Sequence, residues 1–397
     1  MWYLSYLLVS LVVYVIGAFE FFDEELLIKD TGTGHTVFHF NFVSKTPQFE
    51  QTKQHYDIIP KTMFQLFSKY SIDELHLSMV RGYWDDERWG RNFIMAAPTG
   101  AELWAWFTKD TSKWSYRPLG VTKLNGSRED ARRVRYAQMP GEGLCNENLT
   151  PWVKLLPCKG LKGLTSLLLP TALFRSNFNA IKTDLRRICW DYSCSNLGFE
   201  LRQSLTVVFD RRLLYPTPLT PWSLDGLLGT QIQDACKAAS SSNVFILNSP
   251  VQIQSSIPFN TTANPADSRL LSTLPSAQLA TKSAVFSSSA LSKVSAQTLP
   301  LVSVTRYVTG SGTADGGLKS LLISRADFSI RVAYLDLIPW YTQVLFSTLE
   351  LKVLNPQTKQ WESAIPVGKH RNEKAANKAS STDAWWYTGL SLDATEG

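Results

Sequence analysis

Long clusters of basic residues are missing from this 397-residue sequence, although its formal net charge is +6. The densest groups are short: Arg132, Arg133 and Arg135 form one, and Arg186 and Arg187 form another. Proteins that bind nucleic acids normally carry a stronger, clustered basic stripe. We therefore interpret the charge as solvated surface and expect no nucleic-acid partner.

Long hydrophobic runs are also scarce, and the one clear run is at the N-terminus. Residues 1–19 carry no charged side chain, and Trp2 to Ile16 are nearly all apolar before Gly17 and Ala18. This pattern predicts a signal peptide over residues 1–18, with an uncleaved membrane anchor as the alternative. We expect the rest of the chain to face the lumen or the outside of the cell.

Cysteine and histidine are few, at five residues each, and their spacing does not fit the common zinc motifs. In an oxidising compartment, the cysteines are expected to form disulfide bonds. Closeness in sequence predicts that Cys145 pairs with Cys158 and Cys189 with Cys194. Cys236 is then left unpaired.

Sequons for N-linked glycosylation fit the same compartment. Asn125 and Asn260 each begin an Asn-Xaa-Ser/Thr triplet and are candidate glycosylation sites. A third triplet begins at Asn148 but is followed directly by Pro151, which weakens it.

Strand patterns dominate the regular structure that the sequence predicts. In residues 198–213 apolar and polar residues alternate, as in an antiparallel strand with one solvated face. Residues 100–107 are apolar on both faces, so we expect Trp104 to be buried between two layers. One helix is predicted after Pro60, and a hairpin around residues 30–34. The fold class is therefore mainly β, with a luminal β-sandwich-type architecture and few helices.

Composition divides the chain along its length. Residues 238–300 are rich in Ser, Ala and Thr with almost no aromatic residues, which predicts a long loop or insertion. The expected organisation is a signal peptide at 1–18, a luminal β-sandwich domain at 19–237, this loop at 238–300, further strands at 301–365, and a polar tail at 366–397.

Candidate sites for metal or phosphate are weak. His35 and His39 lie four residues apart on a predicted strand, so they share one face, but no thiol or carboxylate partner is apparent. The Gly32–Gly34 segment lacks the Lys-Ser/Thr of a phosphate loop and is a turn. We expect no metal and no cofactor.

Candidate catalytic or ligand-binding groups are equally weak. A Cys/His hydrolase needs a free thiolate beside an imidazole, and His55 and His76 are the plausible bases. Every cysteine has a structural role available, so we expect no catalytic residue. Three acidic residues, Asp85 to Glu87, lie between Trp84 and Trp89, where sugar or cation binding competes with a purely structural acidic turn.

The amino-acid sequences of several segments say more about the function, because they resemble the PIG-T family of GPI transamidase subunits. The resemblance covers roughly residues 22–107, 144–236 and 304–352. It is carried by EELLIKDTGTGHTVFHF, HYDIIPKTMFQLFSKYSIDELHLSMVRGYWDDERWG, APTGAELWAWF, CNENLTPWVKLLPC, GFELRQSLTVVFD, RYVTGSGTADGGLKSLLI and LDLIPWY.

The resemblance implies a non-catalytic scaffold in the membrane complex that attaches glycosylphosphatidylinositol (GPI) anchors to proteins in the endoplasmic reticulum. The nucleophile of that reaction belongs to a caspase-like partner subunit. The expected partners are this subunit, the other membrane subunits, and, through the complex, the GPI lipid and proprotein substrates. The alternatives are a stand-alone secreted lectin-like glycoprotein and an independent thiol hydrolase.

Two departures from the family affect these expectations. The family usually carries, between the positions of Trp114 and Tyr116, a further segment whose cysteine bonds the caspase-like subunit. It also continues into more luminal sheet and a C-terminal transmembrane helix, whereas this sequence ends at Gly397. We expect weaker retention of the partner and of the membrane subunits in this form.

Overall fold

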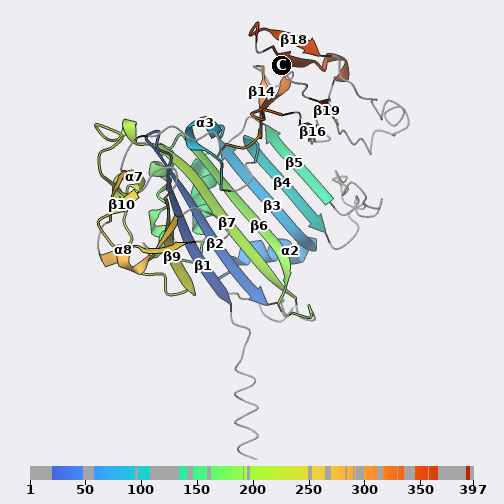
Figure 1. Cartoon of the computed structure of the whole chain (residues 1–397). Helices are drawn as coiled ribbons and strands as arrows, with labels where there is room; N and C mark the ends of the chain where they lie inside the picture. Colours follow the sequence, from blue (N-terminus) through green and yellow to red (C-terminus); the bar gives the residue numbers. More distant parts are fainter. Residues whose placement is uncertain are drawn as a thin grey trace, which may run out of the picture. The chain divides into compact units, whose positions relative to one another are not determined.

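A computed structural model describes most of the chain (Figure 1). It separates into two compact units, formed by residues 1–102 with 140–299 and by residues 103–139 with 300–397. The described residues are 20–47, 58–93, 97–107, 134–140, 146–158, 162–190, 192–194, 197–248, 253–263, 270–281, 284–288, 291, 299–310, 316–328, 330–334, 345–355, 357–364 and 390–393.

A large β-sheet organises the first unit. Its strands are β1 (Phe21–Asp30), β2 (His35–Pro47), β3 (Ile72–Arg81), β6 (Phe178–Cys189), β7 (Leu197–Asp210), β9 (Ser241–Asn248), β11 (Asn260–Ala263) and β12 (Leu270–Pro275). Within this unit they are ordered β11-β12-β9-β1-β2-β7-β6-β3. The β1–β9 pair is parallel and the other pairs are antiparallel (Figure 1).

The segment 238–300, predicted as a long loop or insertion, contributes β9, β11 and β12 to this sheet, so the expectation of a loop is wrong for these strands. β9 pairs with most of β1, from Asp23 with Ser241 to Lys29 with Leu247. Val244 and Ile246 of β9 are buried. The prediction failed because serine-rich composition suggests a loop, whereas a short strand needs only alternate apolar residues and a neighbouring strand.

The register gives the sheet two chemically different faces. Glu24, Phe42, Gln203 and Thr183 lie directly opposite one another on β1, β2, β7 and β6, so they share one face. We call this the covered face, because its side chains on β1, β2 and β7 are almost completely buried. The opposite face, which we call the polar face, carries mainly charged and polar side chains.

The covered face packs against a mixed second layer. This layer contains a small sheet of β8 (Trp222–Ser223), β10 (Ile253–Ser255) and β13 (Val285–Ser288), and the helices α5 (Asn146–Lys154), η1 (Leu164–Leu167), α6 (Pro170–Leu173) and α7 (Leu224–Leu228). Trp222 meets Phe38 of β2 at 5.9 Å between ring centroids, and Trp152 Nε1 donates to Thr183 Oγ1 at 2.8 Å. The predicted mainly β fold with few helices is confirmed.

Two helices contact strands of the large sheet, and the first of them was predicted from the sequence. Helix α2 (Lys61–Tyr70) begins after Pro60, as predicted, and ends at Ser71 in the left-handed conformation (φ 51°). The short helix α3 (Asp86–Trp89) packs against the polar face through Trp89, which joins Val37, Val80 and Phe178 in a buried cluster. Helix α3 thereby covers the few apolar side chains of the otherwise polar face.

The described residues of the second unit include β5 (Val134–Pro140), which is the neighbour of β4 (Gly100–Phe107). They also form three two-stranded ribbons: β14 (Val302–Thr309) with β15 (Gly317–Ser324), β16 (Arg331–Tyr334) with β19 (Leu390–Asp393), and β17 (Leu351–Leu354) with β18 (Trp361–Ala364). β19 lies within the predicted polar tail, most of which is outside the described residues.

The tryptophan-rich strand is β4 (Gly100–Phe107), which begins in the first unit and ends in the second. Ala105 and Phe107 are its buried residues, whereas Trp104 and Trp106 are only half-buried and stack on each other at 5.9 Å. The strand is confirmed, but the deep burial predicted for Trp104 is wrong. A run that is apolar at every position does not show which face is buried.

Residues 1–18, the predicted signal peptide, lie outside the described residues. Among the helices that are described, none has the length and apolar character needed to cross a bilayer.

Candidate functional site

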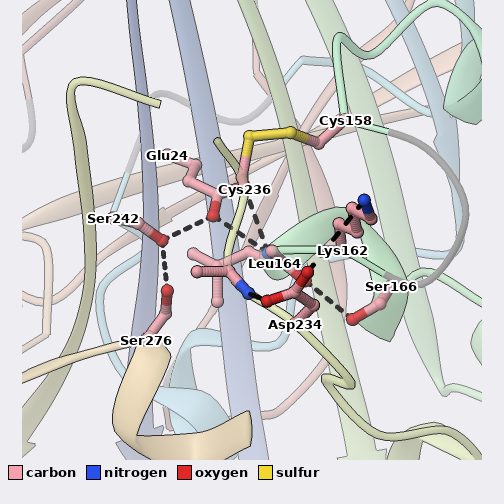
Figure 2. The surroundings of a disulfide bond; sticks show 11 residues. Glu24, Cys158, Lys162, Leu164, Ser166, Asp234, Cys236, Ser242 and Ser276 are labelled. Carbon is pink, nitrogen blue, oxygen red and sulfur yellow. Dashed lines mark hydrogen bonds and ion pairs between the residues drawn. A yellow bond between two sulfur atoms is a disulfide. The ribbon is translucent and has the colours of Figure 1, made fainter. Parts of the chain in front are cut away.

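A buried carboxylate, that of Glu24, is at the centre of the group of residues in Figure 2. Glu24 lies on β1 in the covered face and has no exposed surface. Both carboxylate oxygens accept the backbone N–H of Leu164 at 3.1 Å, and one also accepts the hydroxyl of Ser242. Ser242 in turn hydrogen bonds to Ser276. One side chain therefore joins β1, β9, η1 and the turn after β12.

The close approach of the η1 segment depends on a glycine and a disulfide bond. Gly163 has φ +62°, and a Cβ atom there would lie 2.4 Å from Glu24 Oε1 and 2.7 Å from Cys236 Cβ. Its amide donates to the carbonyl of Asp234 at 2.8 Å. Cys236 is bonded to Cys158, 78 residues away in sequence. Glycine and disulfide together hold two loops against one carboxylate (Figure 2).

The electrostatics of this site indicate a structural role. Burial raises the pKa of Glu24, and the hydrogen bonds from Ser242 and Leu164 offset only part of that effect. A carboxyl group without exposed surface cannot contact a substrate, and the neighbouring sulfur atoms are in a disulfide bond. Since buried polar groups require partners, the site connects four segments and leaves no reactive group.

A second buried polar group closes the opposite end of β1. Arg211 Nη2 lies 2.8 Å from Asp30 Oδ2, and both side chains are 1% exposed or less. Ser288 of β13 hydrogen bonds to both, and the guanidinium lies over the Trp222 ring at 6.0 Å. Burial lowers the pKa of Arg211, while Asp30 raises it. This ion pair fixes the small sheet to the large one, because either charge alone would be buried without a partner.

The polar face is the surface on which functional contacts are possible, because its charged side chains are half-exposed. Glu200 of β7 is surrounded by three cations: Arg186 Nη2 at 2.9 Å, Arg202 Nη2 at 3.5 Å and Lys45 Nζ at 3.7 Å. These three side chains are 40–52% exposed, whereas Glu200 is 7% exposed. The anion is thus largely buried beneath a partly open layer of positive charge.

A second cross-strand group on this face contains a histidine between two carboxylates. His76 Nδ1 lies 2.6 Å from Asp184 Oδ1, and its Nε2 lies 2.7 Å from Glu74 Oε1. The hydrogen bond to Asp184 raises the pKa of His76, and the bond to Glu74 adds to this, while burial opposes it. Lys182 pairs with Asp184 at 3.2 Å. These rows of alternating charge suit polar contact with another macromolecule.

The two candidate metal histidines lie on one face of β2 but have separate partners. His35 Nδ1 hydrogen bonds to Thr33 Oγ1 at 2.9 Å, and His35 Nε2 is 3.6 Å from Asp210. His39 Nδ1 hydrogen bonds to Thr206 Oγ1 at 2.9 Å, and burial lowers the pKa of His39 to about 4. Within the described part of the chain, no three His, Cys, Asp or Glu side chains are grouped to hold a metal ion.

Of the two candidate catalytic bases, one lies in the described part of the chain. His76 has the two carboxylate partners described above. His55 lies outside the described residues.

The disulfide pairing corrects one prediction and agrees with another. Cys158 is bonded to Cys236, so the predicted Cys145–Cys158 pair and the predicted unpaired Cys236 are wrong. Cys189 is bonded to Cys194, as expected from their closeness. Sequence distance misled the first assignment because the pairing of β9 with β1 brings distant segments together. Cys145 lies outside the described residues.

The acidic turn between two tryptophans has a structural explanation. Asp85 caps α3: its Oδ1 accepts the N–H groups of Glu87 and Arg88, each at 3.1 Å. Trp89 is 5% exposed, and Trp84 donates its Nε1 hydrogen to the Gly90 carbonyl at 2.8 Å. The turn thus covers the end of the sheet, and its carboxylates serve the helix.

The glycosylation candidates remain predictions. Asn260 begins strand β11 and is exposed, so an attached glycan would meet no obstacle at that side chain. Asn125 lies outside the described residues.

Sequence reasoning missed the two buried polar groups. Glu24 shares the phase of Phe22, Leu26 and Ile28 in the alternation of β1, so the sequence did carry a signal that its carboxylate points inward. Arg211 follows the end of β7 and has no comparable pattern, and only the tertiary structure reveals its partner.

Comparison with known proteins identifies relatives across nearly all of the chain. The family described as "Gpi16 subunit, GPI transamidase component" matches residues 6–122, 112–218 and 214–382. The mouse GPI-anchor transamidase component PIGT is 30% identical over 385 residues, which are 85% of this chain and 65% of the relative. The human component PIGT is 30% identical over 387 residues, 85% of this chain and 66% of the relative.

A more distant relative extends the comparison to fungi. The GPI transamidase component GPI16 of Saccharomyces cerevisiae is 23% identical over 445 residues, 90% of this chain and 71% of the relative. The chain therefore spans about two thirds of the length of the curated relatives that it matches.

Proposed function

The chain belongs to the Gpi16 family of GPI transamidase components, and on this premise we propose that it is a non-catalytic luminal subunit of the GPI transamidase. It would hold the caspase-like catalytic subunit in place while GPI anchors are attached to proteins in the endoplasmic reticulum. The family match, which extends from residue 6 to residue 382, is the observation that carries this proposal.

The state of the cysteines supports a non-catalytic role. A caspase-like reaction requires a thiolate beside an imidazole base. The four cysteines in the described part of the chain, Cys158, Cys189, Cys194 and Cys236, are all in disulfide bonds. The nucleophile of the reaction would therefore come from another subunit.

The architecture of the first unit supports a scaffold. The buried Glu24 and the Asp30–Arg211 ion pair attach the second layer to both ends of β1, so the sheet is braced along its length. The polar face then offers a fixed array of half-exposed charges around Glu200 and Asp184. A preformed surface of this kind loses little freedom when a partner binds.

The luminal location is supported by chemistry rather than by a membrane segment. Disulfide bonds persist in oxidising compartments such as the lumen of the endoplasmic reticulum. The apolar residues 1–18 and the sequons at Asn125 and Asn260 fit the same compartment.

The test is an activity measurement on the purified chain. We expect no cleavage of a peptide that carries a GPI-attachment signal, and no transfer of that peptide to ethanolamine. A transamidase complex purified in parallel provides the positive control.

Turnover by the chain alone would overturn the proposal if alkylation abolished it. The matched variant is Cys145→Ser, because Cys145 is the cysteine that lies outside the described residues. If this variant also lost the turnover, Cys145 would be the nucleophile and the chain would be an enzyme.

A further inference from the structure

The outermost strand of the large sheet, β11, is an open edge. β11 is at one end of the strand order and has β12 as its neighbour. Among the described residues of the first unit, no strand pairs with its other side. An edge strand presents backbone N–H and C=O groups that can pair with a second chain. This end of the sheet therefore needs protection from such pairing.

Charged side chains, the usual protection of a sheet edge, are missing from this end of the sheet. The strands β9, β11 and β12 contain no Asp, Glu, Lys, Arg or His. Residues 238–266 as a whole also contain none of these residue types. Strands nearer the middle of the sheet differ, since β1 carries Glu24 and Lys29, and β7 carries Glu200 and Arg202. Charge is thus absent where the sheet ends.

The composition of these strands increases the risk of pairing. β9 contains the apolar run at residues 244–247, and β12 begins with two leucines. Uncharged segments with many apolar residues are the ones that associate edge to edge. β11 pairs with residues 270–273 of β12, whereas Leu274 and Pro275 continue beyond this pairing and contact β9. The edge is therefore formed by β11 and by the end of β12.

A glycosylation sequon begins at the first residue of the edge strand. Asn260, followed by Thr261 and Thr262, is the asparagine of this triplet. Its side chain is exposed, and it lies opposite Thr273, where the pairing of β11 with β12 ends. An N-linked glycan is bulky and solubilising. A glycan on Asn260 would therefore lie beside the uncharged edge.

We propose that Asn260 carries an N-linked glycan that prevents the pairing of β11 with a second chain. In the transfer step, the side-chain amide nitrogen of Asn260 bonds to C1 of the first sugar of a lipid-diphosphate-linked oligosaccharide. The bond between C1 and the diphosphate oxygen breaks, the lipid diphosphate leaves, and the amide nitrogen loses one proton. This inference rests on the luminal location in the proposed function, because the glycan is added in that compartment.

The first measurement is the occupancy of Asn260 in the full chain, purified from eukaryotic cells and analysed by peptide mass spectrometry. The parent chain should carry a glycan on Asn260. Thr262→Ala removes the hydroxyl residue that the sequon requires and should abolish this glycan. Thr261→Ala is the matched control, because it keeps an Asn-Xaa-Thr triplet and should keep the glycan.

The second measurement is self-association, followed by size-exclusion chromatography with light scattering at equal protein concentrations. Asn260→Gln and Thr262→Ala should each raise the fraction of dimers and larger species severalfold over that of the parent chain and of Thr261→Ala. Asn260→Lys also lacks the glycan but places a cation at the edge, so it should associate no more than the parent chain.

Trimming the glycan on the folded protein separates protection of the edge from an effect on folding. An endoglycosidase that leaves a single sugar on Asn260 should raise the associated fraction of the parent chain as the substitutions do. The same treatment of Asn260→Lys trims only glycans at other sites, and it should leave the associated fraction unchanged.

The outcomes distinguish this inference from the proposed function. An unmodified Asn260 in a chain that contains the Cys158–Cys236 bond would overturn the inference and leave the proposed function standing. Equal association of Asn260→Gln and the parent chain would overturn it as well, and so would equal association of Asn260→Lys and Asn260→Gln. A parent chain that carries no glycan and has Cys158 and Cys236 reduced would contradict both proposals.

Discussion

The bond between Cys158 and Cys236 should be the stronger of the two covalent contributions to stability. It joins residues 78 positions apart, whereas Cys189 and Cys194 are five positions apart. A disulfide stabilises mainly by restricting the unfolded chain, and the effect grows with the length of the loop that it closes. The two bonds therefore offer an internal comparison within one protein.

The loop lengths give the expected magnitudes. For a separation of 78 residues the loop-closure entropy corresponds to about 4.5 kcal/mol at 25 °C. For a separation of five residues it corresponds to about 2 kcal/mol. Loss of the long-range bond also loosens the loops that carry Gly163 and Asp234, which lie against Glu24. The difference of about 2.5 kcal/mol is therefore a lower bound on the contrast.

The assay is urea unfolding of the chain, monitored by tryptophan fluorescence. The double variant Cys158→Ser with Cys236→Ser is compared with Cys189→Ser with Cys194→Ser, and with the parent chain. Each double substitution removes both sulfur atoms of one bond, so neither leaves a free thiol that exchanges with other cysteines. The change in midpoint multiplied by the m-value gives each cost.

Two results would show that the expected difference between the two disulfide bonds is wrong. Equal costs for the two double variants would show that loop closure does not set the contribution of these bonds. Peptide mapping under non-reducing conditions that found Cys145 bonded to Cys158 would show that the pairing itself is wrong.

Four further substitutions test the burial and charge assignments. Trp222→Ala should lower the free energy of unfolding by about 3–5 kcal/mol, because the side chain is 1% exposed. Trp104→Ala, at a half-buried position, should lower it by about 1 kcal/mol. Equal losses for the two variants in thermal or urea unfolding would contradict the assigned layers. Glu24→Gln should flatten the pH dependence of the free energy of unfolding above pH 4.5. The pKa of Glu24 is raised in the folded state, so the stability that the protonated carboxyl contributes below its ordinary pKa is lost as the pH rises. An unchanged pH profile would contradict the burial of this carboxyl group. His76→Gln should lower the free energy of unfolding more at pH 6 than at pH 9. The pKa of His76 is raised in the folded state, so its stabilisation is present below the ordinary pKa of 6.5 and is lost as the pH rises through the pKa of the folded state. A loss of stability that does not depend on pH would contradict the pairing of His76 with the two carboxylates.

Local patterns in the sequence were sufficient for the elements whose signals are local. The strand predicted over residues 198–213 is confirmed by β7, where Leu201, Leu205 and Val207 are at most 1% exposed. Its predicted solvated face is wrong, because Glu200, Ser204 and Thr206 on that face are only 1–6% exposed. The helix after Pro60 and the hairpin around residues 30–34 are confirmed as well. Each depends on the period of apolar residues or on turn residues within a few positions.

Long-range pairing was not accessible in the same way. The parallel partner of β1 is β9, more than two hundred residues later, in a segment whose serine-rich composition suggests a loop. The Cys158–Cys236 bond follows from that topology, because β9 directly follows Cys236 and brings it beside β1. The site around Glu24 needs all of these segments, so sequence spacing had no means to indicate it.

We propose that this chain serves as a luminal scaffold for the catalytic subunit of the GPI transamidase. The most direct measurement is quantitative mass spectrometry of the subunits that copurify with the tagged chain from membranes of the endoplasmic reticulum in mild detergent. Trp222→Ala, which removes a fully buried side chain of the first unit, provides a control in which this unit is destabilised. We expect the caspase-like subunit to be recovered with the parent chain and in smaller amounts with the control. Recovery of the folded parent chain without any transamidase subunit would show that the chain is not a scaffold for this complex.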